Sequence, residues 1–348
     1  MKPFAQFVFI FVCSVRVAVA ATLSTDFESF TPNSKLPKAS THSKKGFLDR
    51  SGQPPAIRKI TEVEATGNEG CVMEAFLDYD SMTTSNYRAE AMFTADQPGY
   101  DPFGQQNAKE RWYGFRIFIP SDYPYDRRTE LVFQWRGKDW PMNRDSTVSA
   151  SRCRSPNLSL EIKKDQWLFQ RHWFESDTIH FGSNPVPTDG SCPPGNGANW
   201  GSTTNAAHTV LYSFGIVDKG AWTDWVFHIK WSYKADSLGV ITVWKNGTLA
   251  TVWRDSVGGA TAANPIVGKN LHAQLYNLLP QIKWGIYKSP WKNELPDTAT
   301  VRSRRLFFDN VTMGSETATF ADVDPSVHHG KGDCNSLLQP PLIPLLSR

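Results

Sequence analysis

Apolar and polar side chains alternate one by one along much of this chain, and this pattern limits its fold more than any other feature. The stretch QIKWGIYKSPW shows it well, because Ile282, Trp284 and Ile286 occupy every second position. Side chains on a strand point to opposite faces in turn, so these three apolar residues suit a core. Lys283 and Tyr287 then share the other face, which suits a charged ligand.

Seven further segments alternate in the same way and are rich in β-branched and aromatic residues: 86–93, 111–120, 130–137, 157–174, 225–233, 239–253 and 305–313. Such segments are typical of strands. Asn246-Gly247, between the two arms of the sixth, predicts a two-residue hairpin. Many short strands with little helical periodicity predict an all-β fold of two antiparallel sheets packed face to face, a concanavalin-like jelly roll. The concave face of a curved jelly roll can hold a linear polymer.

The two ends of the chain differ from the region between them. Residues 1–20 combine a lysine, an apolar run and the small-residue pattern that ends at Ala20, which predicts a secretory signal peptide cleaved there. No second apolar run follows, so we expect no membrane span and a secreted, extracellular protein. With 40% hydrophobic residues, the chain can bury one large core. We expect a jelly-roll domain at 21–320 and a tail at 321–348.

Cysteine usage agrees with an oxidising compartment. Loss of the signal leaves Cys71, Cys153, Cys192 and Cys334, an even number that allows three pairings. We favour Cys153 with Cys192 and Cys71 with Cys334. Closely spaced cysteine pairs typical of zinc sites are absent from the sequence. We therefore expect no metal in the site and no cofactor, and leave a structural calcium open.

Charge and glycosylation signals also bear on partners. The formal net charge is +3, and two of the positive charges, Lys2 and Arg16, belong to the predicted signal. So small a charge argues against nucleic acid as a partner, and any basic site must be local. Sequons at Asn157, Asn246 and Asn310 agree with a secretory route and predict a glycoprotein. We expect a monomer.

Polar residues gather on one predicted face of two more strands. In ELVFQWRG, alternation places Leu131 with the core-facing aromatic residues and leaves Val132, Gln134 and Arg136 opposite. In NYRAEAMF, Arg88 and Glu90 share a face in the same manner. Each of these residues alone reads as an ordinary solvent-facing side chain. Three strands that repeat the pattern favour a ligand-binding surface.

Arginine, glutamine, lysine and tyrosine on one surface suit β-elimination on a uronic-acid polymer. A base removes the proton on C5 of the sugar, and an acid protonates the departing O4. The intermediate carries extra negative charge next to the carboxylate, which donors such as Arg and Gln stabilise. Tyr287 can act as proton donor or as base, and Lys283 can supply a cation that favours the base form.

These segments resemble polysaccharide lyases of the jelly-roll type. KWGIYKSPW resembles the strand with a K-x-G-x-Y core that carries the catalytic tyrosine, here Tyr287. FQWRG resembles a Q-x-H motif, and YRAEA resembles an R-x-E strand. With residues 222–249, which resemble back-sheet strands, the chain is similar over 71–313 to the heparin lyase I and glucuronan lyase (family 20) group, and more distantly to alginate lyases of family 7. The resemblance implies an acidic polysaccharide as substrate, with Arg88, Gln134 and Arg136 neutralising its carboxylate.

The chain departs from this pattern at one position. Arg136 stands where the Q-x-H motif has histidine, and arginine is a poor base because it stays protonated. Either Tyr287 is both base and acid, or His172 substitutes for the histidine, or the protein binds without cleaving.

Further residues are expected to bind the substrate. Lys283, Glu90 and Lys288 lie in the matching motifs, and Trp140 and Trp291 lie near loops or strand ends where a sugar ring can stack.

Two other functions fit the same fold. A non-catalytic carbohydrate-binding jelly roll is favoured by Arg136. A glycoside hydrolase needs two carboxylates, and those of this fold place them on one strand. The nearest match, FESDTIHF, has Glu175 and Asp177 without the closing acid, so hydrolysis ranks last.

Overall fold

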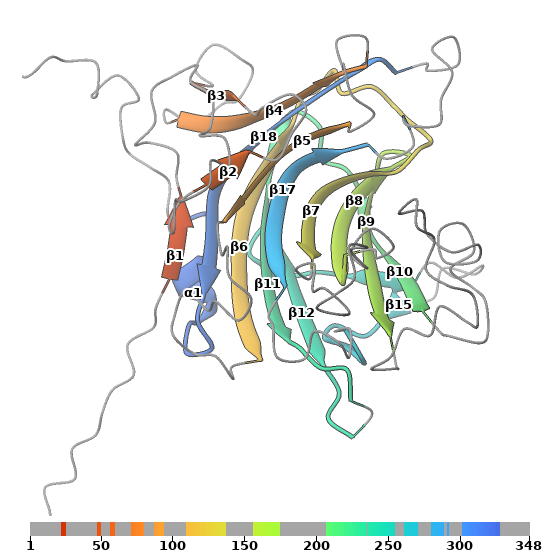
Figure 1. Cartoon of the computed structure of the whole chain (residues 1–348), viewed down its shortest axis with the longest axis vertical. Helices are drawn as coiled ribbons and strands as arrows, with labels where there is room; N and C mark the ends of the chain where they lie inside the picture. The colour runs from red at the N-terminus through yellow and green to blue at the C-terminus, as the bar shows by residue number, and fades with distance from the viewer. Residues whose placement is uncertain are drawn as a thin grey trace, which may run out of the picture.

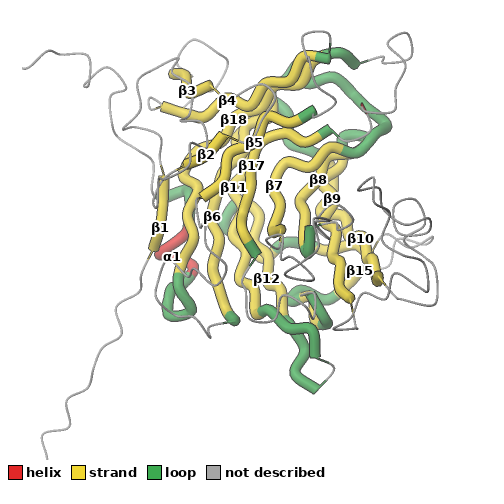
Figure 2. Tube along the Cα trace, in the orientation of Figure 1, coloured by secondary structure: helices red, strands yellow, loops and turns green. Residues whose placement is uncertain are grey.

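A computed structural model of the protein describes residues 22–25, 47–49, 56–59, 71–79, 87–93, 109–136, 156–174, 207–234, 236–254, 261–270, 280–288, 291 and 301–327. Most of these residues form strands, which build two layers (Figure 1). The short helix α1 (Phe320–Val323) follows the last strand and is the one α-helix among the residues described (Figure 2).

The first layer, named the β6 sheet here, has a long strand at its centre. In spatial order it contains β13 (Thr248–Leu249), β12 (Val240–Lys245), β11 (Ala221–Lys230), β6 (Glu110–Ile119), β18 (Ser303–Gly314), β4 (Cys71–Asp78) and β3 (Ala56–Lys59). Two short strands extend it, since β1 (Thr22–Thr25) pairs with β18 and β16 (Ile266–Val267) pairs with β12.

The second layer, named the β17 sheet, carries the candidate site. In spatial order it contains β15 (Thr261–Ala262), β14 (Val252–Arg254), β10 (Ala207–Ile216), β9 (Gln166–Phe174), β8 (Leu158–Lys163), β7 (Glu130–Arg136), β17 (Gln281–Tyr287), β5 (Arg88–Phe93) and β2 (Phe47–Asp49). Neighbouring strands are antiparallel, as the sequence predicted.

The core lies between the sheets and is built from the apolar half of each alternating pattern. Phe115 of β6 stacks on Phe133 of β7 with ring centroids 3.9 Å apart, and Trp135 meets Phe227 of β11 at 4.9 Å. Each fully buried side chain of this size contributes roughly 1.5 to 3 kcal/mol. The opposite side chains of each strand form the outer faces of the two sheets.

Two turns show how well local signals predict hairpins. Asn246 and Gly247 take positive φ values of 51° and 73° between β12 and β13, which confirms the predicted turn. The segment 157–174 instead holds two strands, because Lys164 and Asp165 also take positive φ, 54° and 56°, and close a hairpin between β8 and β9. That second turn has no glycine to mark it.

Candidate functional site on the outer face of the β17 sheet

The strands that carry the candidate residues lie side by side in the structure. β17 sits between β7 and β5, so Lys283 lies opposite Gln134, and Tyr287 lies opposite Arg88. Ile282, Trp284 and Ile286 belong to the core. The faces expected for β17 from alternation are therefore correct, and the polar side chains of three adjacent strands share one outer face.

A bulge next to Gly285 sets the position of Tyr287. Pairing between β17 and β7 shifts register between Trp284 and Tyr287. Gly285 takes a φ of 130°, and a Cβ there would overlap the carbonyl oxygen of Ala89. A residue with a side chain cannot adopt this conformation so close to β5, because the backbones meet there. Glycine thus lets the strand turn Tyr287 toward Arg88.

Glu90 joins two donors from neighbouring strands, and one of them contacts Tyr287. Arg88 Nη1 donates to Glu90 Oε2 at 3.0 Å, and Gln134 Nε2 donates to Glu90 Oε1. The guanidinium carbon of Arg88 lies 3.7 Å from the ring centroid of Tyr287. Burial lowers the pKa of Arg88, but the charges of Glu90 and Tyr287 raise it, and the net pKa is above its usual value. Arg88 therefore stays cationic beside the phenol.

Lys283 and Arg136 add positive charge on the same face. Lys283 is 5% exposed between Gln134 and Met92. Arg136 is half-buried at the end of β7, opposite Gln281 and two positions from Gln134. Arg136 thus occupies the position where the related motif has histidine, and it contributes charge there.

His172 lies on the same face but farther along the sheet. Its Nδ1 is 2.8 Å from Thr209 Oγ1, and burial lowers its pKa to about 4, so the ring is neutral at neutral pH. β8 and β7 separate β9 from β17. Three strand spacings amount to about 14 Å, so the structure does not bring His172 next to Tyr287.

Two expected substrate-binding residues face away from this surface. Lys288 is completely buried, with its ammonium 2.8 Å from Asp126 Oδ2 and 3.3 Å from Glu130 Oε2. Trp291 is 1% exposed and packs edge-on against Tyr79 at 5.4 Å. The alternation that turns Tyr287 outward turns Lys288 inward. Because both are buried, Lys288 and Trp291 are not available to a polysaccharide. Trp140 lies outside the described residues.

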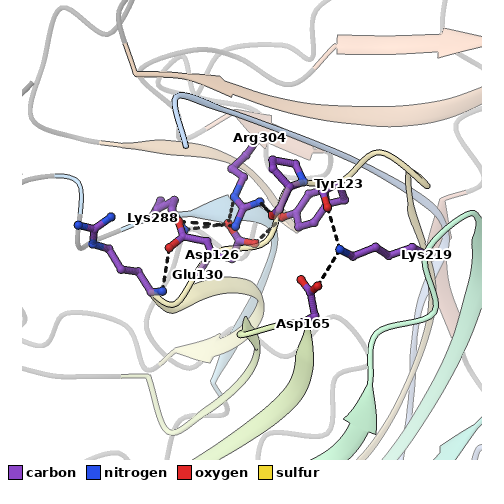
Figure 3. Close-up of polar contacts among 9 residues, drawn as sticks. Tyr123, Asp126, Glu130, Asp165, Lys219, Lys288 and Arg304 are labelled. Atoms are coloured by element: carbon purple, nitrogen blue, oxygen red, sulfur yellow. Dashed lines mark hydrogen bonds and ion pairs between the residues drawn. The ribbon is translucent and has the colours of Figure 1, made fainter. Parts of the chain in front are cut away.

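Lys288 belongs to a buried ionic network (Figure 3), and it directly follows Tyr287 in the chain. Arg304 joins it, with Nε 2.9 Å from Glu130 Oε2 and Nη2 3.7 Å from Asp126 Oδ2. Burial raises the pKa of Asp126, but the hydrogen bond and charge of Lys288 lower it, and the net pKa is below its usual value. The two cations and two carboxylates compensate one another. The network fixes the chain directly after β17.

One titratable residue of the outer face was missed from the sequence. Glu161 of β8 is 4% exposed and accepts a hydrogen bond from Ser159 Oγ at 2.6 Å. Burial raises its pKa to about 7. It lies opposite Leu131, which lies opposite Tyr287. The alternation rule applied to NLSLEIK places Glu161 and Ser159 on the outer face, but it does not predict that Glu161 is buried there.

The expected faces of β7 were wrong at its start. A bulge between Leu131 and Phe133 shifts the register against β8. Val132 joins the core, while Leu131 lies opposite Glu161 and Tyr287 on the outer face. A single extra residue reverses the alternation on one side of a bulge.

Neither a metal-binding cluster nor a membrane-spanning helix occurs in the described part of the chain. Within it, no group of three or more His, Cys, Asp or Glu residues is placed to hold a metal ion. None of its helices is long and apolar enough to cross a membrane. The expectation about calcium stays a prediction.

The fold and the site define a class of protein, and comparison with known proteins gives its family. The fold is a jelly roll of two antiparallel sheets, and the outer face of one sheet carries cations and a tyrosine. The model of the family described as Polysaccharide lyase matches residues 34–312. Since this match covers most of the chain, the protein belongs to the Polysaccharide lyase family and is a polysaccharide lyase. The family expected from the motifs is thereby confirmed.

Solved structures of similar proteins include two lyases. An endo-β-1,4-glucuronan lyase from the fungus Trichoderma reesei is 16% identical, with a TM-score of 0.51 over 87% of this chain and 98% of that one. A marine PL-14 alginate lyase from Aplysia kurodai is 10% identical, with a TM-score of 0.43 over 86% of this chain and 100% of that one. The likeness to the glucuronan lyase confirms the jelly-roll fold. Among curated proteins, no sequence matches the chain.

Proposed function

We propose that the protein cleaves a uronic-acid-containing polysaccharide, glucuronan-like or alginate-like, by β-elimination on the outer face of the β17 sheet. The observation that carries this proposal is the cluster of Arg88, Gln134 and Tyr287 on three adjacent strands, with Glu90 joining the two donors. The name of the similar glucuronan lyase supports the choice of substrate class.

The hydrogen-bond donors of the site can stabilise the negative charge that makes this reaction difficult. Removal of the C5 proton places negative charge on a sugar that already carries a carboxylate. Glu90 holds Arg88 and Gln134 in place, so these donors need little reorganisation during the reaction. Arg136 and Lys283 supply further cations on the same face. Donors held in place before the reaction stabilise such charge most effectively.

Tyr287 is the proposed base and acid. Its phenolate takes the C5 proton, the C5 electron pair forms a C4–C5 double bond, and the C4–O4 bond breaks. The phenol then returns its proton to the departing O4. Arg88, 3.7 Å from the ring centroid, stabilises negative charge on this side chain. The separation between β9 and β17 favours Tyr287 over His172 as the base.

Ultraviolet absorbance of the unsaturated uronide product tests the proposal. Purified protein is offered glucuronan, alginate, heparan-type chains and pectate in parallel. We expect a rising signal on one polymer, lost in Tyr287→Phe and kept in Tyr125→Phe, which changes a tyrosine that is 58% exposed elsewhere. Full activity of Tyr287→Phe would overturn its assignment. Binding without product on every polymer would favour the non-catalytic alternative.

Secretion belongs to the same proposal. Strand β1 begins at Thr22, so cleavage after Ala20 would leave its pairing with β18 intact. Of the three sequons, Asn246 is exposed, whereas Asn157 and Asn310 are buried. We therefore propose Asn246 as the glycan site, which mass analysis of the secreted protein would test.

The disulfide prediction rests on sequence alone. Of the four cysteines, Cys71 begins β4, and Cys153, Cys192 and Cys334 lie outside the described residues.

A further inference from the structure

A single row of directly opposed residues crosses the outer face of the β17 sheet. Each member pairs in register with the next on the neighbouring strand, and opposed residues of antiparallel strands share a face. In order across six strands, the row is Tyr287, Leu131, Glu161, Leu168, Ser213 and Trp253. The row therefore links the proposed catalytic tyrosine to an aromatic side chain near the far edge of the sheet.

Trp253 is far more exposed to solvent than the tryptophans of the core. It is 41% exposed on β14, whereas Trp135, Trp225 and Trp284 are fully buried in the core. Its neighbour Val252 points into the core, so the indole stands on the outer face. The row thus begins at Tyr287 and ends at an indole that is accessible to a ligand on the same outer face.

The chemistry around the row fits an acidic sugar chain. An indole presents a flat apolar face on which the C–H face of a pyranose ring can stack. Lys163, half-buried on β8, lies two positions from Glu161 and shares its face. A cation between the two ends of the row complements the carboxylates of a uronic-acid polymer.

We infer that Trp253 forms a distal sugar-binding subsite, and that the polysaccharide crosses the strands along this row from Tyr287. Five strand spacings separate the two residues, about 24 Å, which is several sugar rings. Long chains therefore reach both ends, while a disaccharide bound at Tyr287 does not. The inference rests on the proposed function, because that function places the reacting sugar at Tyr287.

Binding measurements in the Tyr287→Phe background test this without turnover. Affinity electrophoresis and titration calorimetry compare long glucuronan and alginate chains with the corresponding unsaturated disaccharides. We expect Trp253→Ala to weaken binding of the long chain about tenfold, or ~1.4 kcal/mol, and to leave disaccharide binding unchanged. Trp253→Phe should restore most of the affinity.

Phe76→Ala is the matched control, because Phe76 is also 41% exposed but lies on β4 of the other sheet. It should leave binding of both ligands unchanged. Equal polymer affinity of Trp253→Ala and Phe76→Ala would overturn the subsite while leaving the proposed function in place. If Tyr287→Phe still cleaved polymer, the catalytic assignment would fail, and the binding comparison would still decide the role of Trp253. If protein with Trp253 intact did not bind polymer, both the distal subsite and the proposed function would be overturned.

Discussion

The outer faces of the two sheets carry polar residues at the same alternating positions but surround them differently. On the β6 sheet, His228 lies 2.6 Å from Glu110, and the two side chains are 24% and 38% exposed. On the β17 sheet, His172 is 3% exposed and bonded to the Thr209 hydroxyl, and Glu161 is buried beside a serine. The polar groups of this pair on the first face remain partly exposed to water. Those on the second are buried with altered pKa values, which is typical of a functional site.

The largest effect is expected at Lys288, a buried residue directly after β17. Lys288→Met leaves Asp126 and Glu130 buried against one remaining cation, Arg304. Removing one partner of a buried ionic network typically costs about 3 to 5 kcal/mol. Urea unfolding should show a loss of this size, whereas Lys230→Met, at an exposed lysine of the β6 sheet, should stay within ~0.5 kcal/mol of the wild type. Equal stability of the two variants would contradict the network's role.

Arginine substitutions compare the two faces by activity. Arg88→Lys loses the guanidinium that donates to Glu90 and stacks on Tyr287, so kcat should fall by about 10² to 10³. Arg116→Lys changes the partner of Asp224 on the β6 sheet and should leave kcat within about twofold. Comparable losses of kcat in both variants would show that the outer face of the β17 sheet has no special part in the reaction.

Glu161 gives the β17 sheet a characteristic pH dependence. The folded state raises its pKa from 4.5 to about 7, so its carboxyl is favoured in the neutral form. Its stabilising contribution is present below about pH 4.5 and is lost as the pH rises to about 7, a change of roughly 3 kcal/mol. Glu161→Gln should be more stable than the wild type at pH 8 by about that amount and equal at pH 4. Glu316→Gln, at an exposed glutamate, should leave the stability unchanged at both pH 8 and pH 4. Identical pH profiles for Glu161→Gln and the wild type would disprove the burial effect.

The smallest effect is expected at an exposed ion pair of the β6 sheet. Lys245 Nζ lies 2.6 Å from Asp218 Oδ2, but the side chains are 19% and 42% exposed. Asp218→Asn should lower stability by at most ~1 kcal/mol, and less in high salt. A loss as large as that of Lys288→Met would contradict the contrast between the two faces.

Alternation predicted much of this site because it is a property of each strand alone. It correctly separated Ile282 and Trp284 from Lys283 and Tyr287, and the motifs on three segments correctly indicated the family. It failed at Leu131, where a bulge that depends on pairing with β8 reverses the faces.

Other errors came from long-range geometry. The sequence did not show that Lys288 meets carboxylates of a distant segment, or that two strands separate His172 from β17. Glu161 became notable only when its burial was known, because a glutamate on an alternating strand reads as a solvated residue.

The most direct test of the central claim is a crystal structure of Tyr287→Phe bound to a uronic-acid oligosaccharide. We predict a sugar carboxylate within hydrogen-bonding distance of Arg88 and Gln134 on the outer face of the β17 sheet, with C5 of that sugar beside residue 287. An oligosaccharide bound to the β6 sheet, or one whose carboxylate lies away from Arg88 and Gln134, would contradict it.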